Sequence, residues 1–205
     1  LDKSLVDMKR YATNWTNPKN IERLNIIEKN LKDFKLYQQQ IEDIAQTVDN
    51  TPAVKILFED AAPMASTMVS NITKLIDLEA GQAATADRKA LLGMMADVRG
   101  TTGLALANIR AYLLSGDEKF KAKFDKLWAK NVRRFGDLSN NAVLLTADQA
   151  AAFAAFSSAR AEFSPLPPKM FEIRGGKAWN MANLWLGTKA APTAGAIMAQ
   201  LDGMV

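Results

Sequence analysis

The sequence contains neither cysteine nor histidine. Without cysteine, the chain offers no disulfide, thiolate metal ligand or thiol nucleophile. Without histidine, it lacks the commonest metal ligand, a general base suited to neutral pH and an axial imidazole for haem. Histidine-based hydrolase triads and zinc-peptidase chemistry are therefore excluded. We predict that the protein is not an enzyme, has no catalytic residues and takes no metal or other cofactor.

Long apolar runs and a strong excess of charge are also missing. No apolar run reaches the roughly 18 residues that a membrane span requires. The net charge is only +4, and the densest basic stretch, residues 119–134, is interrupted by Asp125. Because nucleic-acid binding needs clustered basic side chains with stacking aromatics, we predict no nucleic-acid partner. The chain starts without Met and shows no signal peptide, so we expect a domain cut from a longer protein.

The residues that are present favour a helical domain of 205 residues, 48% of them apolar. Residues 64–164 contain no proline, and nowhere does an alternating strand pattern persist. Apolar side chains instead recur in alternating steps of three and four residues, which is the spacing of a heptad seam. Three such seams are Leu24, Ile27, Leu31, Phe34, Gln38, Ile41, Ala45 and Val48; then Leu57, Ala61, Met64, Met68, Asn71, Leu75 and Leu78; and finally Leu91, Met95, Val98, Thr102, Ala105, Ile109 and Tyr112.

Helix start signals agree with these seams. Asn17 and Thr51 each precede a proline, and the segments starting at Ser115 and Thr146 both fit the capping box. Helices are therefore predicted over residues 3–13, 17–49, 52–82, 86–114, 116–140, 147–163 and 177–203, with breaks at 164–168 and 175–176. The longest would extend roughly 50 Å. We predict an all-α fold of elongated, stacked four-helix-bundle modules that share long helices.

The two halves of the sequence resemble each other. Leu5-Val-Asp-Met-Lys-Arg-Tyr11 aligns with Leu106-Ala-Asn-Ile-Arg-Ala-Tyr112, and a second match pairs Leu57…Ala61-Ala62-Pro63 with Leu186…Ala190-Ala191-Pro192. Chance similarity between amphipathic helices is the alternative explanation. We interpret residues 1–205 as one region with an internal repeat, whose first module segment is 1–85 and whose second is 86–205.

One stretch, Asn108-Ile-Arg-Ala-Tyr-Leu-Leu-Ser-Gly-Asp-Glu-Lys-Phe120, resembles extracytoplasmic sensor domains of bacterial methyl-accepting chemotaxis receptors and of related histidine kinases. The segment from Ser164 to Arg174, followed by Trp179-Asn-Met-Ala and by Ala190-Ala-Pro192, is similar to the closing part of such domains. Together with the repeat, the chain is most similar to the helical bimodular type.

This resemblance implies a periplasmic domain of an inner-membrane receptor that acts as a homodimer. It also implies a small-molecule ligand, with an organic acid as our expectation, and a signal passed through flanking membrane helices that this sequence does not include. A ligand could act by favouring one of two discrete helix packings that differ by about 1–2 Å. The alternatives are the sensor domain of a histidine kinase and a non-enzymatic helical adaptor that binds protein partners.

Arg99 and Arg110 are the leading candidates for ligand contacts. They lie beside the third seam and could reach between helices to take a carboxylate, although about 16 Å of helix rise separates them. The alternative is that each arginine buries its stem and keeps its head in water. Thr102 interrupts the seam as a polar residue, which fits either a polar pocket or the specification of helix register. The small residues Gly100 and Gly103 make this segment our first choice for a ligand site.

A second candidate group lies near the Gly175-Gly176 break. Arg174 and Trp179 precede and follow this break, and Tyr112 could add an aromatic wall. Aromatic residues at helical spacing also belong commonly to a hydrophobic core. The predicted ligand-binding set is therefore Arg99, Thr102, Arg110, Tyr112, Arg174 and Trp179.

Overall fold

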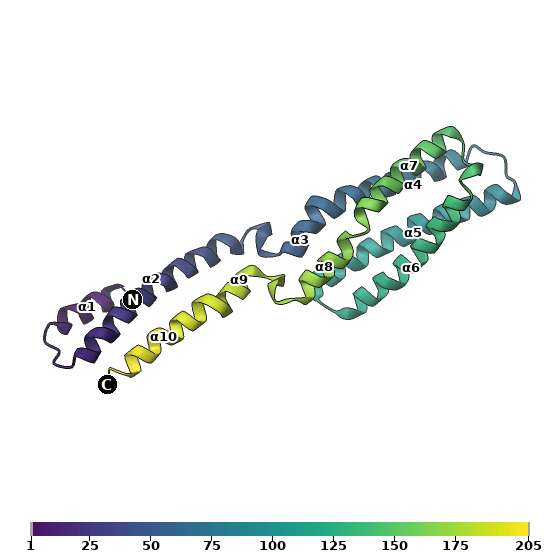
Figure 1. Ribbon diagram of the computed structural model, residues 1–205. Coiled ribbons are helices and arrows are strands. Elements are labelled where there is room, and N and C mark those ends of the chain that lie inside the picture. Colours follow the sequence, from purple (N-terminus) through teal and green to yellow (C-terminus); the bar gives the residue numbers. More distant parts are fainter. Residues whose placement is uncertain (1, 205) are drawn as a thin grey trace. The chain divides into compact units, whose positions relative to one another are not determined.

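The computed structural model describes residues 2–204 and is all-helical over that range, with no strand between these residues (Figure 1). The chain divides into two compact units. We call the unit made from both ends of the chain, up to Thr51 and from Asn180 onward, the terminal unit. We call the unit made from residues 52–179 the central unit.

The central unit is a four-helix bundle. Its first helical stretch consists of α3 (Pro52–Ile56), the π-helix η2 (Leu57–Ala61) and α4 (Ala62–Glu79). The remaining elements are α5 (Ala86–Ser115), α6 (Glu118–Asn140), the short turn η3 (Ala142–Leu144), α7 (Ala147–Phe163), α8 (Leu166–Gly175) and the short turn η4 (Lys177–Trp179). In Figure 1, α5 runs beside α6 and α4 beside α7, and these are the two most closely packed pairs.

The terminal unit places three helical stretches side by side. It contains α1 (Asp2–Ala12), α2 (Pro18–Ala45), the short turn η1 (Val48–Asn50), α9 (Met181–Trp185), the π-helix η5 (Leu186–Ala190) and α10 (Ala191–Asp202). Helix α2 packs against both α1 and the α9–α10 stretch. The side chain of Asn50 accepts a hydrogen bond from the backbone N–H of Ala182, which joins the two parts of this unit.

The predicted seam of α5 is confirmed residue by residue. All seven of its positions are buried, and they contact α4, α6 and α8 in the core of the central unit. In α2 only the first part of the seam is buried, namely Leu24, Ile27 and Leu31, whereas Gln38 and Val48 are exposed. The α2 seam therefore describes a core near one end of that helix only.

The seam predicted for residues 57–78 is displaced by one residue at every second position after Ala61, whereas Met68 and Leu75 are buried as predicted. The buried positions are Leu57, Ala61, Ala65, Met68, Ile72, Leu75 and Glu79, so three predicted positions are each replaced by the following residue. The cause is η2, where the N–H of Ala62 bonds to the carbonyl of Leu57, five residues back. A π turn contains one residue more than an α turn, so it rotates the buried face of the following helix toward the next residue in sequence, and Met68 and Leu75 stay within that face.

The second π-helix, η5, forms at the matching sequence. The N–H of Ala191 bonds to the carbonyl of Leu186, and both π-helices end directly before an Ala-Pro pair. Proline has no N–H and its ring crowds the carbonyl four residues earlier, so a widened turn before it relieves that contact. The match between residues 57–63 and 186–192 is therefore a match of local structure as well as of sequence.

Three sequence predictions about boundaries need correction. The segment 164–168 starts helix α8 rather than only breaking the chain, because prolines in a first helical turn lose no needed hydrogen bond. The N-cap of α6 is Asp117, not Ser115. The helix predicted over residues 177–203 is divided into η4, α9, η5 and α10. The interpretation of residues 1–85 and 86–205 as two repeat segments stays a prediction; the compact units are a separate division of the chain, in which residue 85 lies between α4 and α5 of the central unit.

Candidate functional site

A surface groove runs between α4 and α5, and it contains Arg110. Its volume is about 660 Å³, which is in the range of small-molecule sites. Small and polar side chains from α4 form one wall, and Leu106 and Arg110 of α5 form the other. The lining residues are Ala62, Ala65, Ser66, Val69, Ser70, Thr73, Lys74, Asp77, Leu106 and Arg110.

The two cations in this groove are not neutralised by salt bridges. Arg110 and Lys74 are both exposed, and neither forms an ion pair with another described residue. The hydroxyls of Ser66 and Ser70 line the same wall of α4. A guanidinium without a counter-ion, next to an ammonium and hydroxyl donors, can receive a carboxylate through charge-assisted hydrogen bonds.

Arg99 reaches the edge of this groove. Its Nε donates to Oγ1 of Thr73 over 2.9 Å, and Thr73 itself lines the groove. The structure thus brings both predicted arginines to one groove, where Arg110 lines the hollow directly and Arg99 fixes a side chain of the opposite wall. Asp77 contributes the one carboxylate of the lining, and its negative charge repels a bound anion, so it limits the charge of the acid that the groove can bind.

Thr102 lies elsewhere, in the core of the central unit. It is 1% exposed, and its hydroxyl donates to the carbonyl of Val98 over 2.8 Å. The side-chain amide of Asn131, itself fully buried, donates to Thr102 Oγ1 over 3.0 Å and to Thr101 Oγ1 over 2.9 Å. These bonds join α5 to α6, so Thr102 contributes to helix register and does not line the α4–α5 groove. Sequence reasoning missed Asn131, whose position fits a solvated helix face.

The other predicted residues, Tyr112, Arg174 and Trp179, meet at the far end of the same helix. They line a hollow of about 450 Å³ together with Gly116, Glu118, Gly175, Gly176 and Lys177. The carbon of the Arg174 guanidinium lies 4.5 Å from the centre of the Trp179 ring system. The hydroxyl of Tyr112 donates to Glu118 over 3.0 Å, and burial, followed by this bond to a carboxylate, raises the pKa of Tyr112.

Arg174 is already engaged by the protein. Its Nε donates to the carbonyl of Leu113 over 2.8 Å, where it satisfies a carbonyl in the last turn of α5. Gly116 permits this approach, because it has a φ of 70° and any Cβ there would lie 2.7 Å from Arg174 Nη2. Sequence reasoning did not select Gly116, although a glycine directly after a helix commonly takes this conformation. Arg174 thus caps a helix, which leaves the α4–α5 groove as the better candidate site.

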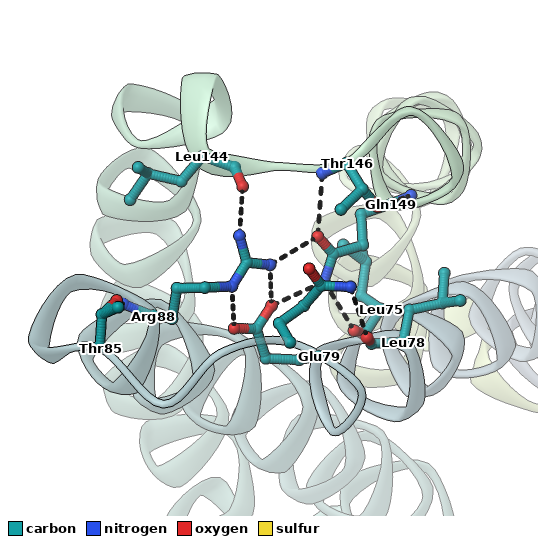
Figure 2. A network of polar contacts seen from close by, with 9 residues as sticks. Leu75, Leu78, Glu79, Thr85, Arg88, Leu144, Thr146 and Gln149 are labelled. Atoms are coloured by element: carbon teal, nitrogen blue, oxygen red, sulfur yellow. Dashed lines mark hydrogen bonds and ion pairs between the residues drawn. The ribbon is translucent and has the colours of Figure 1, made fainter.

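A third polar cluster closes the end of the central unit and is fully paired (Figure 2). Arg88 donates through Nε and Nη2 to the two carboxylate oxygens of Glu79, at 2.8 and 2.7 Å, and through Nη1 to the carbonyl of Leu144 at 2.9 Å. Gln149 donates to Glu79 over 2.7 Å, and its side-chain oxygen accepts from Arg88 and from the backbone N–H of Thr146. The side chains of Glu79, Arg88 and Gln149 are hydrogen-bonded to other groups of the protein, so none of them is left for a ligand. The cluster therefore joins α4, α5 and α7 and offers no ligand site.

Between residues 2 and 204, no three acidic side chains converge closely enough to hold a metal ion. None of the helices over that range combines the length and the apolar character of a membrane span.

Comparison of the chain with models of protein families, with curated proteins and with solved structures gave no match in any of the three.

Proposed function

We propose that this chain is the ligand-sensing domain of a bacterial chemotaxis receptor and that it binds a small organic acid in the α4–α5 groove. The observation that carries the proposal is Arg110, an exposed guanidinium without an ion-pair partner among residues 2–204, set in a groove of suitable size between two helices of one bundle. The chain's resemblance to sensor domains of these receptors supports the wider role, including a periplasmic location and a homodimeric state.

The groove also suggests how binding would act on the fold. Arg110 belongs to α5, whereas the hydroxyls and Lys74 on the opposite wall belong to α4. A dicarboxylate held by both walls would favour one relative placement of the two helices. A coupling of about 1–3 kcal/mol is typical when a ligand discriminates between two such states. The first groove residue of α4, Ala62, directly follows the π-helix η2, where the hydrogen-bond register of this helix changes.

A histidine-kinase sensor domain remains the closest alternative, because the same domain could serve either output. A helical adaptor is the second candidate, and it has an observation of its own. Large apolar side chains are exposed in the terminal unit, among them Val6 and Tyr11 of α1, Leu36 of α2 and Met198 of α10. Exposed apolar residues of this kind are used to bind partner helices.

Thermal denaturation with a panel of acids tests the proposal. We expect a dicarboxylate such as succinate to raise the melting temperature by mass action, and its uncharged diamide to leave it unchanged. Arg110→Gln should abolish the effect, and Arg99→Gln should weaken it by releasing Thr73. Arg133→Gln is the matched control, since Arg133 is also exposed, has no ion pair in the described chain and lies on α6.

The outcomes separate the candidates. A succinate response that survives Arg110→Gln, or the absence of a response to any acid, would contradict the α4–α5 groove as the site. Binding of amphipathic helical peptides without any response to acids would favour the adaptor.

A further inference from the structure

Helix α6 presents a row of cations to solvent. Its seven basic and three acidic side chains give it a net charge of +4, which equals the net charge of the whole chain. Five of the basic residues follow one another in steps of three and four, share one side of the helix and are exposed. We call them the α6 basic row, and they are Lys119, Lys123, Lys126, Lys130 and Arg133. Asp125 interrupts the basic stretch in the sequence, but its position on the helix lies outside this row.

The α6 basic row borders an exposed, uncharged face of α5. Lys130 and Arg134 of α6 both pair with Asp97 of α5, each over 2.7 Å, which places the row beside α5. Next to Asp97, Ala96 belongs to a set of glycine, alanine and leucine residues on the outer side of α5. We call this set the α5 outer face, and its exposed members are Gly93, Ala96, Gly100, Gly103, Leu104, Ala107 and Leu114.

No contact inside the bundle explains three glycines of the α5 outer face. At Gly93, Gly100 and Gly103 an added Cβ would meet no described atom within 4 Å, so internal packing does not require glycine there. Glycine in the middle of a helix is less favourable than alanine. It does allow another helix to approach closely, because the distance between packed helices depends on the side chains at the contact. Leu104 and Leu114 are 55% and 87% exposed, so a helix packed on this face would also cover apolar surface.

Cations lie along both borders of the α5 outer face. The α6 basic row forms one border, and the exposed residues Arg99 and Arg110 follow the other. Within the row, Lys123, Lys126 and Arg133 form no ion pair with any residue between 2 and 204. A helix seated on this face would therefore meet unpaired positive charge beside its apolar contact.

We propose that the α5 outer face and the α6 basic row together dock an amphipathic helix of a partner protein, whose apolar seam is flanked by glutamate and aspartate. Charge complementarity selects this occupant. A second copy of this chain would bring cations against cations. A lipid surface takes up large apolar side chains, whereas glycine and alanine form the centre of this face. Nucleic acid is bound by cations together with stacking aromatics, and the α5 outer face contains no aromatic residue. The contact does not depend on an acid in the α4–α5 groove.

A designed helical peptide of about 20 residues is the probe, because the α6 basic row extends over about 21 Å. It carries leucine and alanine in its seam and glutamate at the flanking positions, and its counterpart carries glutamine in place of every glutamate. Calorimetric titration into the whole chain, in a buffer free of carboxylic acids, measures both affinities. We expect the glutamate peptide to bind, the glutamine peptide to bind about tenfold more weakly or less, and the affinity for the glutamate peptide to fall as salt is added.

Gly100→Leu tests the α5 outer face. It should weaken binding of the glutamate peptide about tenfold or more, because the added side chain keeps the partner helix away. The melting temperature should not fall, since the position has open space and leucine favours the helix more than glycine does. Gly195→Leu is the matched control: Gly195 is an exposed glycine of α10 with the same open surroundings, and this variant should bind the peptide like the parent.

Lys123→Gln combined with Lys126→Gln tests the α6 basic row. We expect the glutamate peptide to bind about fivefold more weakly, because two exposed ion pairs are lost. Lys29→Gln with Lys169→Gln removes two other exposed lysines that form no ion pair in the described chain, and it should leave binding unchanged.

Four results would overturn the proposal. The first is equal binding of the two peptides or of neither, and the second is unchanged binding in Gly100→Leu. A dimer of the parent in sedimentation, dissociated by Gly100→Leu, would identify a second copy as the occupant. Binding to phosphatidylglycerol vesicles or to duplex DNA in place of the glutamate peptide would identify a lipid surface or nucleic acid instead.

Discussion

Arg88→Met should destabilise the central unit strongly, because it leaves a buried carboxylate with one donor. The side chain of Glu79 is 4% exposed and that of Arg88 is 17% exposed. In the variant, Glu79 keeps only the 2.7 Å bond from Gln149. Removing one partner of a buried ion pair costs about 3–5 kcal/mol. For a chain of this length that corresponds to a fall in melting temperature of about 6–20 °C.

The double variant Glu79→Met with Arg88→Met tests whether the unpaired carboxylate of Glu79 causes the loss of stability. Replacing both charges with apolar side chains leaves no unpaired charge, so most of the lost stability should return. Circular dichroism during urea and thermal denaturation measures all three proteins, with Arg133→Met as an exposed-arginine control that should change the free energy of unfolding by less than about 0.5 kcal/mol. If the single variant loses less than about 1 kcal/mol, or the double variant is as unstable as the single, the network does not stabilise the bundle as argued.

Two further predictions concern acid stability and the π-helix. The ammonium of Lys130, and after it Arg134, hold the pKa of Asp97 below its ordinary value of 3.8. The stability that Asp97 contributes should therefore be complete above about pH 5 and be lost as the pH falls through the lowered pKa. Because this carboxylate is partly exposed, Asp97→Asn should cost about 1 kcal/mol or less at pH 7, and the difference from the parent should vanish in acid denaturation once the pH lies below the lowered pKa. Deletion of Asp60 should convert η2 into regular α-helix and keep the buried positions on both sides in register, so the melting temperature should change little. Deletion of Thr67 in α4 is the control; it should destabilise severely, and equal effects of the two deletions would contradict this account of η2.

Local spacing predicted most of the helices and one of the core faces completely. The seam of α5 contains no π turn, so its seven buried positions follow directly from heptad arithmetic. The seam of α4 failed at Met64, Asn71 and Leu78, each by one residue, because a π-helix adds a residue that a periodic pattern does not reveal. Helix α8 was missed because its prolines were interpreted as breakers, although they occupy its first turn.

The candidate site was predictable only where it depends on a single helix. Arg99 and Arg110 could be selected because their positions beside the α5 seam follow from spacing. The other wall of the groove comes from α4, and no local pattern indicates which side chains of α4 face Arg110. The same holds for Asn131 and Arg160, which lie 29 residues apart in sequence and meet only because α6 and α7 fold together. The division into two units also depends on such long-range pairing.

The order of the two units in the chain has a consequence for the order in which they fold. The central unit is continuous in sequence, whereas the terminal unit combines segments that lie before Thr51 and after Asn180. Residues 52–179 can therefore complete their bundle before α9 and α10 have emerged, because domains fold as units while the chain appears. Helices α1 and α2, although they emerge first, must wait for α9 and α10 before their apolar side chains are covered. During that interval the apolar side chains of α2 that pack against α9 and α10 are exposed, and a chaperone would be most useful then.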